Sequence, residues 1–62
     1  MFGIFGNGVT ARSIEKHFIH SNQSYFKFDD NYLYLNGEQK RLDVEQLSQM
    51  IVKAKGVLIS PG

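Results

Sequence analysis

A chain of 62 residues has room for one domain with a small hydrophobic core. Its hydrophobic fraction of 42% is typical of a globular protein, and its net charge of +1, with both signs mixed along the chain, offers no basic surface for nucleic acid. The sequence has no cysteine for disulfides or thiolate metal sites, and no apolar run near the roughly 20 residues of a membrane span. It also lacks a signal-peptide pattern, so we expect a cytoplasmic protein that acts away from membranes.

The first two predicted elements are a strand over residues 1–5 and a helix over residues 9–20. The apolar run at 1–5 has no polar alternation, which is typical of a parallel strand covered on both faces. Ala11, Ile14 and Phe18 recur at helical spacing and predict one apolar stripe that faces a sheet.

The stretch Gly6-Asn7-Gly8-Val9-Thr10-Ala11 joins these elements as a glycine turn. Such a turn needs no side chain at Gly6, where the backbone reverses, none at Gly8, where a phosphate approaches, and a small residue at Ala11, where helix and strand pack closely. The free N–H groups and the positive dipole end of the helix then form an anion site. Strand, turn and helix together predict a phosphate-binding site.

Two histidines lie in the last turn of this helix. His17 and His20 are either ligands of a metal ion, for which no third ligand is evident, or solvated side chains that suit the negative end of the helix dipole. We favour the second interpretation and expect no metal site. Asn22 is the expected stop, because Asn tolerates the left-handed conformation that ends helices.

The run Tyr25-Phe26-Lys27-Phe28 predicts a second strand, which ends in Asp29-Asp30-Asn31. Asp29 follows Gly8 by 21 residues, and an acidic residue about 20 positions beyond the glycines completes a dinucleotide-binding pattern. Its carboxylate accepts hydrogen bonds from a sugar hydroxyl or a base N–H. The alternative is a plain turn, which these residues form readily. The glycine turn upstream favours the ligand role.

Residues 32–42 predict a β-hairpin. Asn36-Gly37 separates two strand-like runs, and both positions accept the positive φ that tight hairpin turns need. The returning run at 38–42 is polar, so we expect it at an edge of the sheet or standing off it. Tyr32 and Tyr34 either stack on a ligand base or pack within the protein, and packing is the commoner role.

Asp43 is expected to cap a second helix, with Gln46 three residues later in a capping-box-like pair. The predicted apolar stripe of this helix is flanked by Met50 and consists of Val44, Leu47, Ile51 and Ala54. Gly56 is the predicted residue just past the helix end. Residues 57–59 then predict a buried parallel strand, and Ser60-Pro61-Gly62 predicts a turn.

This order of elements predicts an α/β fold, namely a Rossmann-like parallel sheet with flanking helices and an added β-hairpin. The carboxyl ends of its three parallel strands carry Gly6–Ala11, Asp29–Asn31 and Ser60–Gly62. Because ligands of open α/β sheets bind at those ends, we expect the three segments to meet in one crevice.

With these segments in place, the chain resembles the N-terminal domain of the Mur ligase family, most like the members that add D-glutamate to UDP-N-acetylmuramoyl-alanine. The family opens with an apolar strand and a Gly-x-Gly-x-Thr-Gly-like turn, here Gly6–Ala11, and continues with a strand ending in Asp, here Phe28-Asp29. A later strand closes in Ser-Pro-Gly, here Ser60-Pro61-Gly62. Ala11 stands where the family has a glycine. The arginine that often follows the Asp is missing, so Asn31 or a later group would have to serve.

The resemblance implies that the domain binds the UDP part of UDP-N-acetylmuramoyl-alanine. It places Gly8, Val9 and Thr10 at the phosphates and uridine. It places Asp29, Asp30 and Asn31 at the uracil, and Ser60 and Gly62 beside the nucleotide. None of them is catalytic, and we expect the chain alone to be inactive.

In the whole enzyme, the resemblance implies an ATP- and Mg²⁺-dependent ligase that forms an amide bond with D-glutamate in peptidoglycan synthesis, and so serves cell shape and division. Nothing in residues 1–62 matches the family's Gly-Lys-Thr/Ser phosphate loop or its C-terminal domain. We therefore expect a truncated N-terminal domain, either marginally stable or self-associating through an uncovered sheet edge.

Two alternatives come from other functional classes. One is a nicotinamide-dinucleotide-binding Rossmann module of a dehydrogenase or sensor, which Gly6–Ala11 and Asp29 satisfy equally well but Thr10 and Ser60-Pro61-Gly62 satisfy less well. The other is a small α/β interaction domain without a ligand. A phosphate loop encoded downstream of residue 62 would decide for the ligase.

Overall fold

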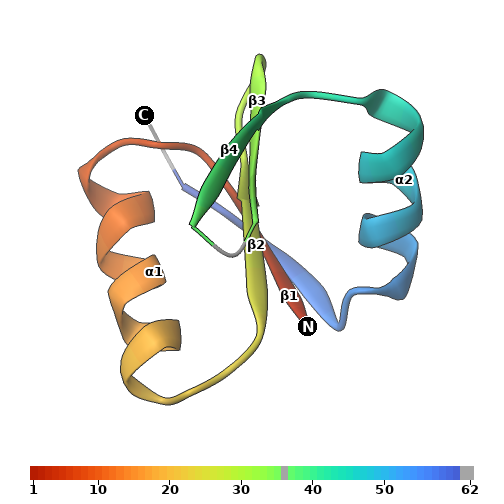
Figure 1. Cartoon of the computed structure of the whole chain (residues 1–62). Helices are drawn as coiled ribbons and strands as arrows, with labels where there is room; N and C mark the ends of the chain where they lie inside the picture. Colours follow the sequence, from red (N-terminus) through yellow and green to blue (C-terminus); the bar gives the residue numbers. More distant parts are fainter. Residues whose placement is uncertain (36, 61–62) are drawn as a thin grey trace.

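The structure is a computed structural model that describes residues 1–35 and 37–60. Within these residues it contains a five-stranded mixed sheet and two helices (Figure 1). The elements follow in the order β1 Phe2–Phe5, α1 Val9–His20, β2 Tyr25–Phe28, β3 Tyr32–Leu35, β4 Glu38–Arg41, α2 Val44–Lys53 and β5 Gly56–Ile59.

The sheet has the strand order β4-β3-β2-β1-β5. β1 lies between β2 and β5 and pairs with both in parallel. β3 runs antiparallel to β2, and β4 antiparallel to β3. The predicted α/β class and hairpin are confirmed, but the expectation of a parallel sheet holds only for β1, β2 and β5. The three-residue connection Asp29–Asn31 is too short for a crossover, so β3 can only return antiparallel.

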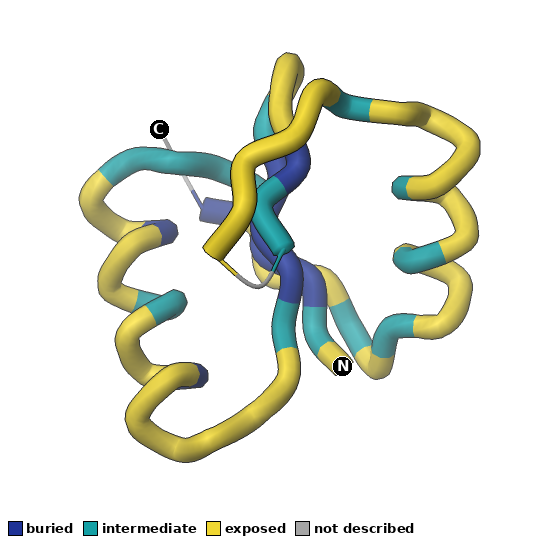
Figure 2. Tube along the Cα trace, in the orientation of Figure 1, coloured by how far each residue is buried: buried dark blue, intermediate teal, exposed yellow. Residues whose placement is uncertain are grey.

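The two helices cover opposite faces of the sheet, so the core has two separate halves (Figure 1). On the α1 face, buried Ile4 contacts Ala11 and Phe18, as the predicted stripe requires. On the α2 face, the buried residues Phe26, Phe28 and Leu33 all come from the sheet. Figure 2 shows the difference: α1 turns two buried residues inward, whereas α2 has none. The α1 half is therefore the more tightly closed one.

α2 ends at Lys53, earlier than the predicted stop at Gly56 implies, and the face that it buries differs in part from the predicted one. Asp43 caps the helix as expected. The predicted stripe is confirmed at Leu47 and at the C-cap residue Ala54, but Met50 packs on the sheet in place of Val44 and Ile51. Val44 is 70% exposed because it lies in the first turn, directly after the cap. Ile51 is 39% exposed, since the helix is turned so that Met50 faces the sheet.

Gly56 begins β5 and does not act as the stop of α2. The Lys55 N–H donates to the carbonyl oxygen of Met1 at 2.8 Å, so pairing with the first strand begins immediately after the helix. The predicted left-handed stop of the first helix is confirmed, because Asn22 has a φ of 57°. In the hairpin turn Gly37 has the expected positive φ of 79°, while Asn36 lies outside the described residues.

β5 is not the buried strand predicted from its apolar residues, but it does form the uncovered sheet edge that was expected. Leu58 is 43% and Ile59 74% exposed, since in the described part of the chain β5 pairs with β1 alone. The opposite edge, β4, is polar and exposed throughout, as predicted. The two edges therefore differ: charged side chains protect β4 against further pairing, and β5 has no such protection.

Two glycines in neighbouring strands allow a matched test of close packing. A Cβ on Gly3 would lie 2.6 Å from Cζ of the fully buried Phe26, whereas a Cβ on Gly56 would lie 3.7 Å from the nearest Phe2 atom. We expect Gly3→Ala to lower the free energy of unfolding by about 1–3 kcal/mol through overpacking. Gly56→Ala should be tolerated. Urea unfolding measures both, and equal midpoints for the two variants would contradict this packing.

Candidate functional site

The glycine turn leaves the centre of the sheet in the conformation that the sequence predicts. Gly6 has a φ of 125°, which side chains rarely allow, and its N–H donates to the Phe28 carbonyl oxygen at 2.8 Å. A Cβ at this position would lie 3.0 Å from Cβ of Ser60 and 3.6 Å from Cβ of Ala11. Gly6 therefore permits the sharp turn. It also lets the start of α1 and the residue that follows β5 lie close together.

The described residues provide a side-chain cap for the N-terminus of α2 but none for that of α1. Gly8 is the N-cap of α1, and within the described residues it receives no side-chain cap; the first turn also holds no acidic residue. In α2, by contrast, Asp43 Oδ1 accepts hydrogen bonds from the N–H groups of Glu45 and Gln46, at 3.0 and 3.4 Å. The first N–H groups of α1 thus point out of the helix with no intrahelical acceptor, where an anion can accept them.

Ser60 closes the other side of this turn. Its N–H donates to the Phe5 carbonyl oxygen at 3.0 Å, and its side chain is buried beside Gly6. β1 precedes α1 and β5 follows α2, and these two helices lie on opposite faces of the sheet (Figure 1). Ligands in open α/β sheets bind outside the carboxyl ends of the strands. The predicted contact Gly62 lies outside the described residues.

Asp29 shapes the turn that follows β2. Its Oδ1 accepts hydrogen bonds from the N–H groups of Asn31 and Tyr32, at 2.8 and 2.7 Å, and its Oδ2 accepts one from the Tyr34 hydroxyl at 3.3 Å. The contacts of Asp29 are therefore those of a turn-forming residue. Its role toward a ligand remains a prediction. Asp30 and Asn31 are exposed, as are Val9 and Thr10 at the start of α1.

A polar network under α1, which was not predicted from the sequence, joins these segments. Lys27 is 5% exposed, and its ammonium donates to Asn7 Oδ1 at 2.9 Å and to Glu15 Oε1 at 3.3 Å. The Tyr25 hydroxyl donates to Glu15 Oε2 at 2.9 Å, and Asn7 Nδ2 donates to the Tyr34 hydroxyl at 3.1 Å. One signal was available: a lysine within an apolar strand has to find a charged or polar partner.

The two tyrosines of β3 take different positions. The Lys27 ammonium lies 4.7 Å from the centre of the Tyr34 ring, so Tyr34 packs within the protein, which was the commoner of its two expected roles. Burial and the charge of the nearby Asp29 carboxylate raise the pKa of Tyr34. Tyr32 is 41% exposed at the end of the sheet where Asp29 lies. Of the two, only Tyr32 presents a ring to solvent for a ligand.

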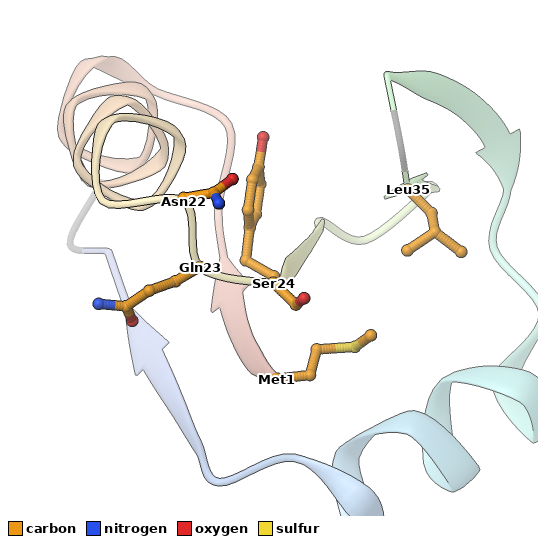
Figure 3. Close-up of a pocket in the computed structure, with 6 residues that line it drawn as sticks. Met1, Asn22, Gln23, Ser24 and Leu35 are labelled. Atoms are coloured by element: carbon orange, nitrogen blue, oxygen red, sulfur yellow. The ribbon is translucent and has the colours of Figure 1, made fainter.

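A shallow hollow lies at the opposite end of the sheet (Figure 3). It is lined by the residues that precede β1, the start of β2 and the end of β3: Met1, Asn22, Gln23, Ser24, Tyr25 and Leu35. Concavity alone therefore points to the amino ends of the parallel strands, and the backbone geometry points to their carboxyl ends. The hollow offers neither an open helix N-terminus nor a charged side chain, whereas the carboxyl ends carry the open N-terminus of α1.

The described residues contain no group of three or more His, Cys, Asp or Glu side chains placed to hold a metal ion, and His17 and His20 are exposed. No helix in residues 1–35 and 37–60 is long and apolar enough to cross a membrane. Comparisons with protein-family models, curated proteins and solved structures found no match.

The network predicts an alkaline loss of stability that depends on Tyr25. Burial, together with the hydrogen bond and charge of Glu15, raises the pKa of Tyr25 from 10.0 to about 12. The folded state favours the protonated phenol, so this contribution is complete below pH 10 and disappears as the pH rises from 10 to 12. Tyr25→Phe should be less stable near neutral pH and lose less stability in that window.

Urea midpoints measured across this pH range test the prediction, with Tyr32→Phe as the control at an exposed tyrosine. The control should keep the alkaline loss of the wild type. Identical pH profiles for Tyr25→Phe and the wild type would contradict a stabilising Tyr25–Glu15 bond.

Proposed function

We propose that this chain binds the UDP part of UDP-N-acetylmuramoyl-alanine, as the Rossmann-like N-terminal domain of a Mur ligase that adds D-glutamate. The observation that carries the proposal is the N-terminus of α1 at Gly8, which has no side-chain cap among the described residues and opens beside Gly6 and Ser60 at the carboxyl ends of β1 and β5. A diphosphate is an anion of the kind that such a helix start accepts.

The exposed residues around this opening supply groups for the rest of the nucleotide. In the proposed complex the pyrophosphate lies against the N–H groups of Gly8, Val9 and Thr10, and the hydroxyl of the exposed Thr10 donates to it. Asp30 and Asn31 offer acceptors and an amide for the uracil edge, and Asp29 supports them through its turn. Ser60 borders the nucleotide, together with Gly62 by resemblance.

The chemistry of the whole enzyme would come from residues outside this chain. ATP would phosphorylate the substrate carboxylate to an acyl phosphate, and the D-glutamate amine would then attack that carbonyl carbon and release phosphate. Mg²⁺ would neutralise the transferring phosphates. In this proposal the residues of the present chain bind and orient the UDP end of the substrate, and the chain alone has no ligase or ATPase turnover.

Titration of the chain with UDP and with NADP, followed by backbone amide signals, tests the proposal. UDP should shift the signals of Gly8, Val9 and Thr10 and those of Asp30 and Asn31. NADP should bind more weakly, because its additional phosphate meets the carboxylates of Asp29 and Asp30. Stronger shifts with NADP would instead favour a dinucleotide-binding module, and no shift with either ligand would contradict both.

Two substitutions at Gly8 separate binding from stability. Gly8 has a φ of −86°, which any residue adopts, and Asp and Asn are about equally good N-caps. Gly8→Asp and Gly8→Asn should therefore unfold at similar urea concentrations. Gly8→Asp should bind UDP at least about tenfold more weakly than Gly8→Asn, because only Asp places a negative charge at the phosphate position. Equal affinities for UDP would contradict an anion site at this helix start.

A further inference from the structure

The buried ammonium of Lys27 does more than neutralise Glu15. We propose that Lys27 is a positioning residue for the candidate site: through Asn7 and Tyr34 it holds the glycine turn and the Asp29 turn in a fixed relation. The identity of the ligand in this inference rests on the proposed function. The positioning itself is a property of the free chain.

The first step is that Asn7 anchors the turn. It stands between Gly6 and Gly8, and glycines leave the backbone unusually free, so a Gly-Asn-Gly turn has little stiffness of its own. Asn7 is the one side chain among these three residues, and both ends of its amide are engaged. Oδ1 accepts from Lys27 at 2.9 Å, and Nδ2 donates to the Tyr34 hydroxyl at 3.1 Å.

The second step is that Lys27 cannot easily release Asn7. Its ammonium is enclosed by three partners: Asn7 Oδ1, Glu15 Oε1 and the face of the Tyr34 ring. Lys27 is 5% exposed, so water does not readily replace a lost partner, and an unpaired charge at this position is strongly unfavourable. Hydrogen bonds from a charged donor are also about twice as strong as neutral ones. The amide of Asn7 is therefore held at a defined place.

The third step extends this order from the glycine turn to the Asp29 turn. The Tyr34 hydroxyl accepts from Asn7 and donates to Asp29 Oδ2 at 3.3 Å, so one hydroxyl touches both segments proposed to border the nucleotide. Asp29 in turn fixes the N–H groups of Asn31 and Tyr32. A continuous hydrogen-bonded path thus runs from the buried ammonium to the residues proposed to meet the uracil.

The test removes the anchor without leaving an unpaired buried charge. The double variant Glu15→Gln/Lys27→Met takes away both charges, and Gln still offers an acceptor to the Tyr25 hydroxyl. Tyr25→Phe is the matched control, because it removes a hydrogen bond from the same network at the end remote from Asn7. Both variants are compared with the wild type by urea unfolding, NMR backbone order parameters and UDP titration.

We expect the order parameters of residues 6–10 to fall from about 0.85 toward 0.6 in the double variant and to stay near the wild-type values in Tyr25→Phe. The double variant should also bind UDP about tenfold more weakly, as expected for the loss of hydrogen bonds to a charged group. Tyr25→Phe should keep wild-type affinity even where its unfolding midpoint is lower.

The outcomes distinguish this inference from the proposed function. Unchanged order parameters in the double variant would overturn the positioning role, whether or not the chain binds UDP. Unchanged UDP affinity in the double variant would overturn the link between this network and binding. Failure of the wild-type chain to bind UDP counts against the proposed function alone, because the order parameters test the positioning role in the absence of ligand.

Discussion

The structure depends on one buried charge, the ammonium of Lys27 inside the α1 half of the core. Such a charge is tolerated only where each of its donors meets an acceptor or an aromatic face. Its partners come from three other parts of the chain: Asn7 in the glycine turn, Glu15 on α1 and Tyr34 on β3. The requirement to satisfy one lysine therefore sets the relative placement of the turn, the helix and the hairpin. No buried side-chain N or O atom in the described residues lacks a partner.

The two faces of the sheet serve different purposes. The α1 face combines close packing at Ala11 and Phe18 with the polar network, and this combination gives the candidate site its defined geometry. The α2 face is a simpler apolar layer in which the aromatic residues of β2 lie under a helix that has no buried residue. We therefore expect the backbone order of the glycine turn to depend on the packing and hydrogen bonds of the α1 half.

Much of this arrangement could be predicted from local sequence signals. The glycine turn, the bounds of α1, the stop at Asn22 and the cap at Asp43 each depend on a few neighbouring residues, and the structure contains all of them. The predictions that failed concern tertiary context. The apolar sequence of β5 would suit a central strand as well as an edge strand, so its position in the sheet could not be predicted. Whether Met50 or Ile51 faces the sheet depends on how α2 is rotated relative to it, which local sequence does not determine.

The candidate site divides in the same way. Sequence could predict that Gly6, Asp29 and Ser60 lie at the carboxyl ends of the parallel strands, because the order of elements implies it. It could not predict the Lys27–Asn7–Tyr34 contacts, which join residues 20 and 27 positions apart, nor that the hairpin tyrosine would pack on the lysine.

In the proposed complex the nucleotide lies at the carboxyl ends of β1 and β5, although the hollow in Figure 3 lies at the opposite end. Intermolecular nuclear Overhauser effects between the ribose and uracil protons of UDP and the protein test this placement most directly. We predict contacts from these ligand protons to Thr10 and Asn31. Contacts confined to Asn22, Ser24 and Leu35, which line the hollow, would contradict the account.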